Sequence, residues 1–193
     1  MSQRRSILIG VGIPILFVVG ILVWGVIQND GQPGRPGVNS NFGNVPVTAQ
    51  ADADFDLITL DGESISLSSL QGKVVMVDFW SSWCAPCRAE APVLAEAYRT
   101  WRDRGVEFVG IAIWDQNDDV REFVAANGIE YPNAIDADGQ VAIEFGVSGI
   151  PEKFFVMPDG EIVRKIVGPN TRRSLDDILG QLVDEAIGIT AAR

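Results

Sequence analysis

The chain has 193 residues, a formal net charge of −11, two cysteines and no histidine. A strongly acidic chain argues against nucleic acid or anionic lipid surfaces as partners, and the same charge keeps a domain soluble. Two cysteines without histidine cannot close a four-ligand zinc site within one chain, and Arg88 after the second cysteine excludes a Cys-x-x-Cys-His haem site. We therefore expect no cofactor and no metal.

The N-terminal sequence predicts a cytoplasmic stretch over residues 1–6 and a transmembrane signal anchor over residues 7–27. Arg4 and Arg5 precede an uncharged apolar run, which is long enough as a helix to cross a bilayer core of roughly 30 Å. Basic residues favour the cytoplasmic side, so the rest of the chain is placed outside the cytoplasm. The alternative is a cleaved signal peptide, whose apolar core is usually shorter, at roughly 7–15 residues.

Residues 28–53 are rich in Gly, Pro, Asn and Gln and predict a flexible linker, followed by one folded domain over residues 54–193. The expected strands are 55–60 and 63–67, forming a hairpin around an Asp-Gly turn, then 74–80, 106–114, 134–135, 153–157 and 161–167. The expected helices are 86–102, with a kink at Pro92, then 118–127, 140–145 and 174–187. This order predicts an α/β fold, a mixed central sheet flanked by helices with an extra N-terminal β-hairpin.

The two cysteines stand as Cys84-Ala85-Pro86-Cys87, directly after an apolar strand and at the start of a helix. Three interpretations are open: a structural disulfide, a metal site shared between chains, and a redox dithiol. A disulfide that closes so short a loop removes little unfolded-state entropy, whereas a helix N-terminus favours a thiolate. We therefore favour a redox dithiol, in which solvent-facing Cys84 attacks a disulfide and buried Cys87 releases the product.

The segment from Val77 to Arg88 resembles the active-site signature of the thioredoxin superfamily, and Gly149-Ile150-Pro151 resembles its cis-proline loop. Within the superfamily the chain is similar to the membrane-anchored TlpA, ResA and DsbE (CcmG) branch. The similarity rests on the N-terminal hairpin, the insert over residues 113–145 and the uncleaved anchor. It implies a thioredoxin-like fold and a thiol:disulfide oxidoreductase that reduces disulfides outside the membrane, chiefly in cytochrome c maturation.

The resemblance also assigns roles to two acidic residues. Asp78 matches the buried aspartate of thioredoxin and is the expected proton acceptor for Cys87. The alternative is an outward-facing residue, since strand faces alternate. Glu90 matches a glutamate that adjoins the thiols in ResA-like proteins, where its negative charge would raise the thiol pKa. The alternative is a helix residue that serves only the dipole.

Substrate contacts are expected from four residues. Trp83 is predicted to form a groove rim. The resemblance implies that Ile150, before a cis Pro151, pairs its backbone with a substrate strand. An ordinary trans proline is the alternative. Glu152 faces either the substrate or the solvent.

The leading interpretation is a reductant of protein disulfides such as that of apocytochrome c, supplied with electrons by a membrane thiol donor. An oxidant of the same fold is the first alternative, because the residues around a dithiol tune its potential over a wide range. A tethered binding module without catalysis is the second. Glu90 favours the reductant, and the presence of both cysteines argues against the binding module.

Overall fold

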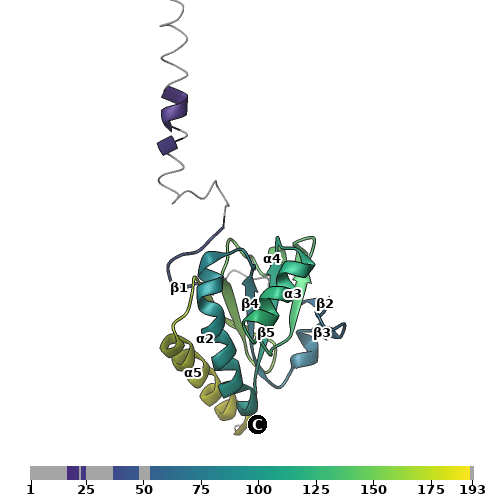
Figure 1. The fold of residues 1–193 in the computed structure, drawn as a ribbon. Coiled ribbons are helices and arrows are strands. Elements are labelled where there is room, and N and C mark those ends of the chain that lie inside the picture. The colour runs from purple at the N-terminus through teal and green to yellow at the C-terminus, as the bar shows by residue number, and fades with distance from the viewer. Residues whose placement is uncertain (1–16, 22, 25–36, 48–52, 192–193) are drawn as a thin grey trace, which may run out of the picture. The chain divides into compact units, whose positions relative to one another are not determined.

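The computed structural model describes residues 17–21, 23–24, 37–47 and 53–191. The chain divides into two units, Met1–Pro36 and Gly37–Arg193, and the folded domain is the second (Figure 1). Among the described residues, no helix combines the length and apolar character that crossing a bilayer requires. The predicted anchor over residues 7–27 lies largely outside them.

The domain is built on a six-stranded mixed sheet in the order β1-β8-β7-β4-β5-β6. Its strands are β1 (Gly43–Val45), β4 (Val74–Trp80), β5 (Val106–Ile113), β6 (Asn133–Asp136), β7 (Glu152–Val156) and β8 (Ile162–Val167). Strands β4, β5 and β6 run parallel, while β7, β8 and β1 pair antiparallel with their neighbours. Every residue of β4 is buried, as expected for a central strand covered on both faces.

Helices cover both faces of this sheet (Figure 1). Side chains of α2 (Ala85–Trp101) and α5 (Arg172–Ala191) pack with Val74 and Met76 of β4. The opposite face is covered by α3 (Asn117–Ala126), α4 (Gln140–Glu144) and the two-stranded hairpin of β2 (Asp56–Ile58) and β3 (Ser64–Ser66). Short 3-10 helices lie at η1 (Ser68–Leu70) and η2 (Arg102–Arg104). Because strand side chains alternate, Asp78 shares the face of Met76 and leaves the sheet toward α2.

The predicted mixed sheet, its flanking helices and the N-terminal hairpin are confirmed, with boundaries that differ by a few residues. Helix α2 continues through Pro92.

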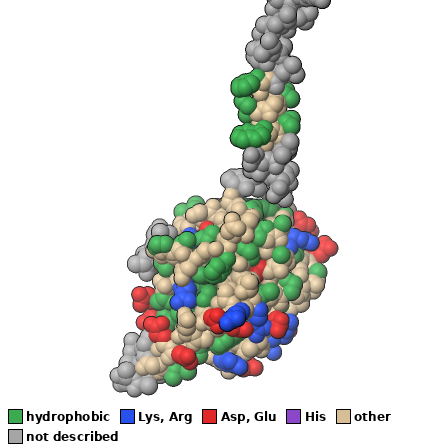
Figure 2. Space-filling model, turned by 90° about the vertical axis from the view of Figure 1, so that its left-hand side faces the viewer, with side chains coloured by type: hydrophobic (Ala, Val, Ile, Leu, Met, Phe, Trp, Pro, Cys, Tyr) green, Lys and Arg blue, Asp and Glu red, His purple; other side chains and the backbone are tan. Residues whose placement is uncertain are grey.

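Figure 2 shows one face of the domain, across which acidic, basic and hydrophobic side chains are mixed.

The folded domain begins earlier than residue 54, which corrects part of the expected linker over residues 28–53. Strand β1 belongs to the sheet, with Gly43 opposite Val167 and Val45 opposite Lys165 of β8. The composition of this segment did not predict a strand. An open sheet edge offers backbone N–H and C=O groups, however, and pairing with them needs no particular side chains. Residues 28–36 and 48–52 of the expected linker lie outside the described residues.

Candidate active site

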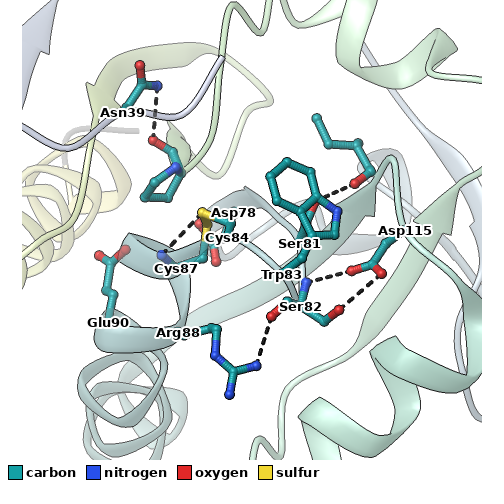
Figure 3. The surroundings of a disulfide bond; sticks show 12 residues. Asn39, Asp78, Ser81, Ser82, Trp83, Cys84, Cys87, Arg88, Glu90 and Asp115 are labelled. Carbon is teal, nitrogen blue, oxygen red and sulfur yellow. Dashed lines mark hydrogen bonds between the residues drawn. A yellow bond between two sulfur atoms is a disulfide. The ribbon is translucent and has the colours of Figure 1, made fainter. Parts of the chain in front are cut away.

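Cys84 and Cys87 form a disulfide at the start of α2 (Figure 3). Cys84 is the N-cap residue, and its sulfur accepts a hydrogen bond from the backbone N–H of Cys87 at 3.3 Å. Pro86 lies in the first helical turn, where its missing N–H is no loss. In the reduced protein the same N–H group and the positive end of the helix favour a Cys84 thiolate.

The loop between β4 and Cys84 is held from two sides (Figure 3). The backbone N–H of Ser82 donates to Asp115 Oδ2 at 2.5 Å, and its hydroxyl donates to Oδ1 at 3.0 Å. On the other side, the Arg88 guanidinium donates to the Ser82 carbonyl at 3.0 Å. Trp83 Nε1 donates to the Trp114 carbonyl at 2.9 Å, and the indole lies half-buried beside the disulfide. Asp115 was not predicted as a site residue, because its role depends on a contact distant in sequence.

Both cysteines are buried, with exposed fractions of 1% for Cys84 and 5% for Cys87. The expectation that Cys84 faces solvent is therefore wrong for this disulfide form. Val38, which the sequence assigned to a linker, packs against the apolar cluster that contains both cysteines and Ile150. The N-terminal segment thus shares in covering this region.

Two carboxylates near the disulfide, Asp78 and Glu90 (Figure 3), share one fully buried ammonium group. Lys153 Nζ lies 2.6 Å from Glu90 Oε2 and 3.5 Å from Asp78 Oδ1. The second Glu90 oxygen accepts a hydrogen bond from the Asn170 backbone N–H at 2.6 Å. Apart from its ion pair with Lys153, Asp78 Oδ1 has no hydrogen-bond partner among the described residues.

Burial dominates the pKa shifts of the two carboxylates in this cluster. It raises the pKa of Asp78, and it raises the pKa of Glu90 to about 7, although Lys153 opposes both shifts. Burial lowers the pKa of Lys153, but the two carboxylates outweigh this effect and the net pKa is raised. If both carboxylates were ionised, the buried cluster would carry one uncompensated negative charge. Near neutral pH it therefore tends to hold an extra proton on a carboxylate, close to the dithiol.

Asp78 is 3% exposed, so it is not the outward-facing residue of the alternative interpretation. Glu90 is 2% exposed and is paired with Lys153. Lys153, which completes the cluster, was not predicted as a site residue. A signal was present, because a lysine directly before the apolar run of β7 must find a partner if it is buried.

The Ile150–Pro151 peptide bond is cis, as predicted. The Ile150 side chain is buried, and both of its backbone groups are paired. Its N–H donates to the Gly37 carbonyl, and its carbonyl accepts from the Asn39 N–H at 2.6 Å. The backbone that was expected to receive a substrate strand is thus occupied by the chain itself.

Glu152 is 1% exposed and does not face solvent in this structure, which corrects that reading of this residue. Its Oε2 lies 2.8 Å from Lys165 Nζ, and its Oε1 accepts from the Ser148 N–H at 3.3 Å. Lys165 also donates to the Gly146 carbonyl at 2.8 Å. The buried ion pair between Lys165 and Glu152 therefore holds the loop that leads into the cis-proline.

The chain is similar to known proteins that belong to one family. The AhpC/TSA family matches residues 48–165. The chain belongs to this family. The match confirms the predicted membership of the thioredoxin superfamily.

Relatives of this AhpC/TSA chain carry names for the same chemistry. The thiol-disulfide oxidoreductase ResA of Bacillus subtilis (strain 168) is 29% identical over 181 residues, covering 93% of this chain and 94% of that protein. The thiol:disulfide interchange protein CycY of Rhizobium leguminosarum bv. viciae is 39% identical over 122 residues, covering 63% and 64%. The solved structure of MTB DsbF has a TM-score of 0.64 and 33% identity, covering 70% of this chain and 99% of that one. With the Cys84–Cys87 disulfide, these likenesses confirm the predicted enzyme class, a thiol–disulfide oxidoreductase.

Proposed function

We propose that this chain is a membrane-anchored, extracytoplasmic reductant of protein disulfides that acts on apocytochrome c during cytochrome c maturation. The observation that carries the direction of transfer is the pair of buried carboxylates, Asp78 and Glu90, near the dithiol. To the extent that these carboxylates ionise, their negative charge disfavours a thiolate and so disfavours the reduced protein relative to its disulfide. A dithiol that is destabilised in this way gives up its electrons more readily.

The dithiol would reduce a client in two exchange steps. The Cys84 thiolate attacks one sulfur of the client disulfide, forming a mixed disulfide and releasing one client thiolate. Cys87 then passes its proton to the Asp78 carboxylate, and its thiolate attacks the Cys84 sulfur. The second client thiolate leaves, the Cys84–Cys87 disulfide forms, and two electrons have passed to the client. A membrane thiol donor would return the two electrons.

The reduction potential of the dithiol tests the direction. A value near or below that of thioredoxin, roughly −270 mV, is expected for a reductant, and a value near about −120 mV would make the protein an oxidant. Lys153 gives the oxidant alternative some support, because a buried ammonium favours thiolates. Failure of the wild-type chain to reduce insulin would instead favour a binding module.

The client is tested with two oxidised peptides of equal composition. One carries the Cys-x-x-Cys-His sequence of apocytochrome c, and the other has its residues scrambled around the same disulfide. We expect faster reduction of the first. Equal rates would make the protein a general reductant and remove apocytochrome c from the proposal.

The anchor is supported by Arg4 and Arg5 before the apolar run that ends at Ile27. Protease added to intact cells should digest the C-terminal domain only after any outer barrier is opened. A mature soluble protein that lacks its first 27 residues would overturn the anchor and favour a cleaved signal peptide.

A further inference from the structure

An N-terminal strap, residues 37–47, is held against the domain at two places. At one, the Ile150 N–H donates to the Gly37 carbonyl, the Asn39 N–H donates to the Ile150 carbonyl at 2.6 Å, and Val38 forms a parallel bridge with Ile150. At the other, β1 pairs with the outer edge of β8. The first attachment lies in the surroundings of the disulfide, where Figure 3 shows Asn39.

The backbones of strap and loop are in close contact near the cis-proline. A Cβ added to Gly149 would lie 2.5 Å from the Gly37 carbonyl oxygen, and the three nearest heavy atoms all belong to Gly37. The Asn39 side chain donates to the Pro151 carbonyl at 3.5 Å and to Glu152 Oε1 at 3.4 Å. These contacts place the strap where an extended peptide approaching this loop would lie.

We propose that the strap is an intramolecular occupant of the substrate-docking edge and must leave Ile150 before a protein disulfide reacts with Cys84. The Ile150 N–H has one hydrogen and can serve either Gly37 or a substrate carbonyl as its full partner. The occupant that fits in place of the strap is an extended segment of a client protein, recognised through its backbone. This inference rests on the proposed function only in that a protein disulfide docks beside Cys84.

The attachment at Ile150 is suited to exchange. Between its two attachments the strap passes through Ser40, Asn41 and Phe42, which are exposed although the Asn41 backbone lies close to Gly168. At this attachment the strap's apolar contact is Val38, and a short segment with so few apolar contacts opens locally at small free-energy cost while the sheet beneath it stays folded. The strap can therefore open at Ile150 without unfolding of the domain.

The first test changes Asn39 of the strap and leaves the sequence of the cis-proline loop at Ile150 unchanged. Asn39→Pro removes the N–H that pairs with the Ile150 carbonyl. Reduction of insulin by the full chain should become at least about fivefold faster, the equivalent of one net backbone hydrogen bond, because the Asn39 side-chain contacts with Pro151 and Glu152 are lost as well. Gly43→Ala is the matched control, because it lies in the same strap, has no atom within 4 Å of the added Cβ and has no left-handed φ. An unchanged rate in Asn39→Pro would overturn the proposal.

The second test observes the strap directly by hydrogen exchange. In wild type and in Gly43→Ala the Asn39 amide should be protected, whereas Gly149→Ala, whose added methyl collides with Gly37, should expose it. In a Cys87→Ser protein trapped as a mixed disulfide with a cysteine peptide, the Asn39 amide should exchange freely while the Ile150 amide stays protected. Continued protection of Asn39 in that mixed disulfide would refute strap displacement.

The two tests separate this proposal from the proposed function. If no variant reduces insulin, the reductant assignment fails, yet the exchange of Asn39 in wild type and Gly149→Ala still decides whether the strap occupies Ile150. If all variants reduce insulin at the same rate, the assignment as a reductant stands and the strap has no role in the reaction.

Discussion

Lys153 lies directly opposite Asp78 in the register of β7 and β4, and its ammonium group reaches Glu90 of α2 at 2.6 Å. Cross-strand partners leave a sheet on the same face, so the register alone brings Lys153 toward Asp78. The helix that begins at the dithiol supplies the third charge. Sheet pairing and helix position together therefore set the protonation of the groups beside Cys87.

Replacing this lysine should destabilise the fold strongly. Lys153→Met leaves two buried carboxylates without their ammonium, and breaking a buried ion pair on one side costs about 3–5 kcal/mol. Urea denaturation at pH 8 should show a loss of this size. At pH 5 the loss should be smaller, because protonated carboxylates no longer need the lysine.

The control for this variant is Lys73→Met. Lys73 pairs with Glu107 at 2.8 Å, but its side chain is 47% exposed, so the expected change is below about 1 kcal/mol. Equal losses in the two variants, or a loss in Lys153→Met that does not depend on pH, would contradict the buried-cluster account.

Glu90→Gln should flatten part of the pH dependence of stability. Burial raises the pKa of Glu90 from 4.5 to about 7, so between these values the folded protein holds a proton that the unfolded chain has released. The contribution of Glu90 to stability is therefore fully present at low pH, falls as the pH rises from about 4.5 to about 7, and is constant above that. Unfolding free energies measured over this window should fall less steeply in the variant. An identical slope in both proteins would assign the dependence to another group.

The same substitution should make the dithiol more oxidising. Removing a negative charge, and leaving Lys153 with Asp78 alone, lowers the pKa of the Cys84 thiol and so stabilises the reduced form. One pKa unit corresponds to about 1.4 kcal/mol, or about 30 mV for a two-electron couple, so the shift should be tens of millivolts. Thiolate absorbance and equilibration with glutathione measure the two quantities. A thiol pKa that stays constant or rises would reduce Glu90 to a structural helix residue.

The sequence predicted those parts of the fold that local pattern encodes. Alternation and apolar runs located strands β4 to β8 of the central sheet, and the Cys84-to-Cys87 spacing at a helix start located the redox centre. Asp78 and Pro151 followed from their place in recognised motifs. Each of these signals lies within a few residues of the feature that it predicts.

The remaining parts depend on contacts between distant segments. Lys153 acquires its role from the strand register, and Asp115 from its position across the loop at Ser82. The strap around Asn39 has a composition typical of linkers, and only the open edge at Ile150 and β8 gives it a conformation. Glu152 appeared exposed in sequence because its partner, Lys165, lies on the next strand. No local pattern carries this information.

Cys87→Ser should accumulate mixed disulfides with client proteins. The variant keeps Cys84 at the helix N-cap but lacks the thiol that releases the client. Non-reducing gels of cells that express each variant should show adducts for Cys87→Ser and few for Cys84→Ser. The reverse pattern would exchange the roles of attacking and resolving cysteine.

Asp78→Asn should slow the release of the client from the mixed disulfide. The carboxylate is buried near the dithiol and burial raises its pKa, whereas an amide of the same size accepts no proton. Loss of a general base costs about a hundredfold or more, so formation of the Cys84–Cys87 disulfide at pH 7 should slow by that factor. The rate of this step is measured by acid quenching of the reaction between the reduced protein and a cysteine peptide disulfide. At pH 9, above the ordinary thiol pKa of about 8.5, Cys87 ionises unaided and most of the rate should return. A variant that is equally slow at both pH values would make Asp78 a structural partner of Lys153 only.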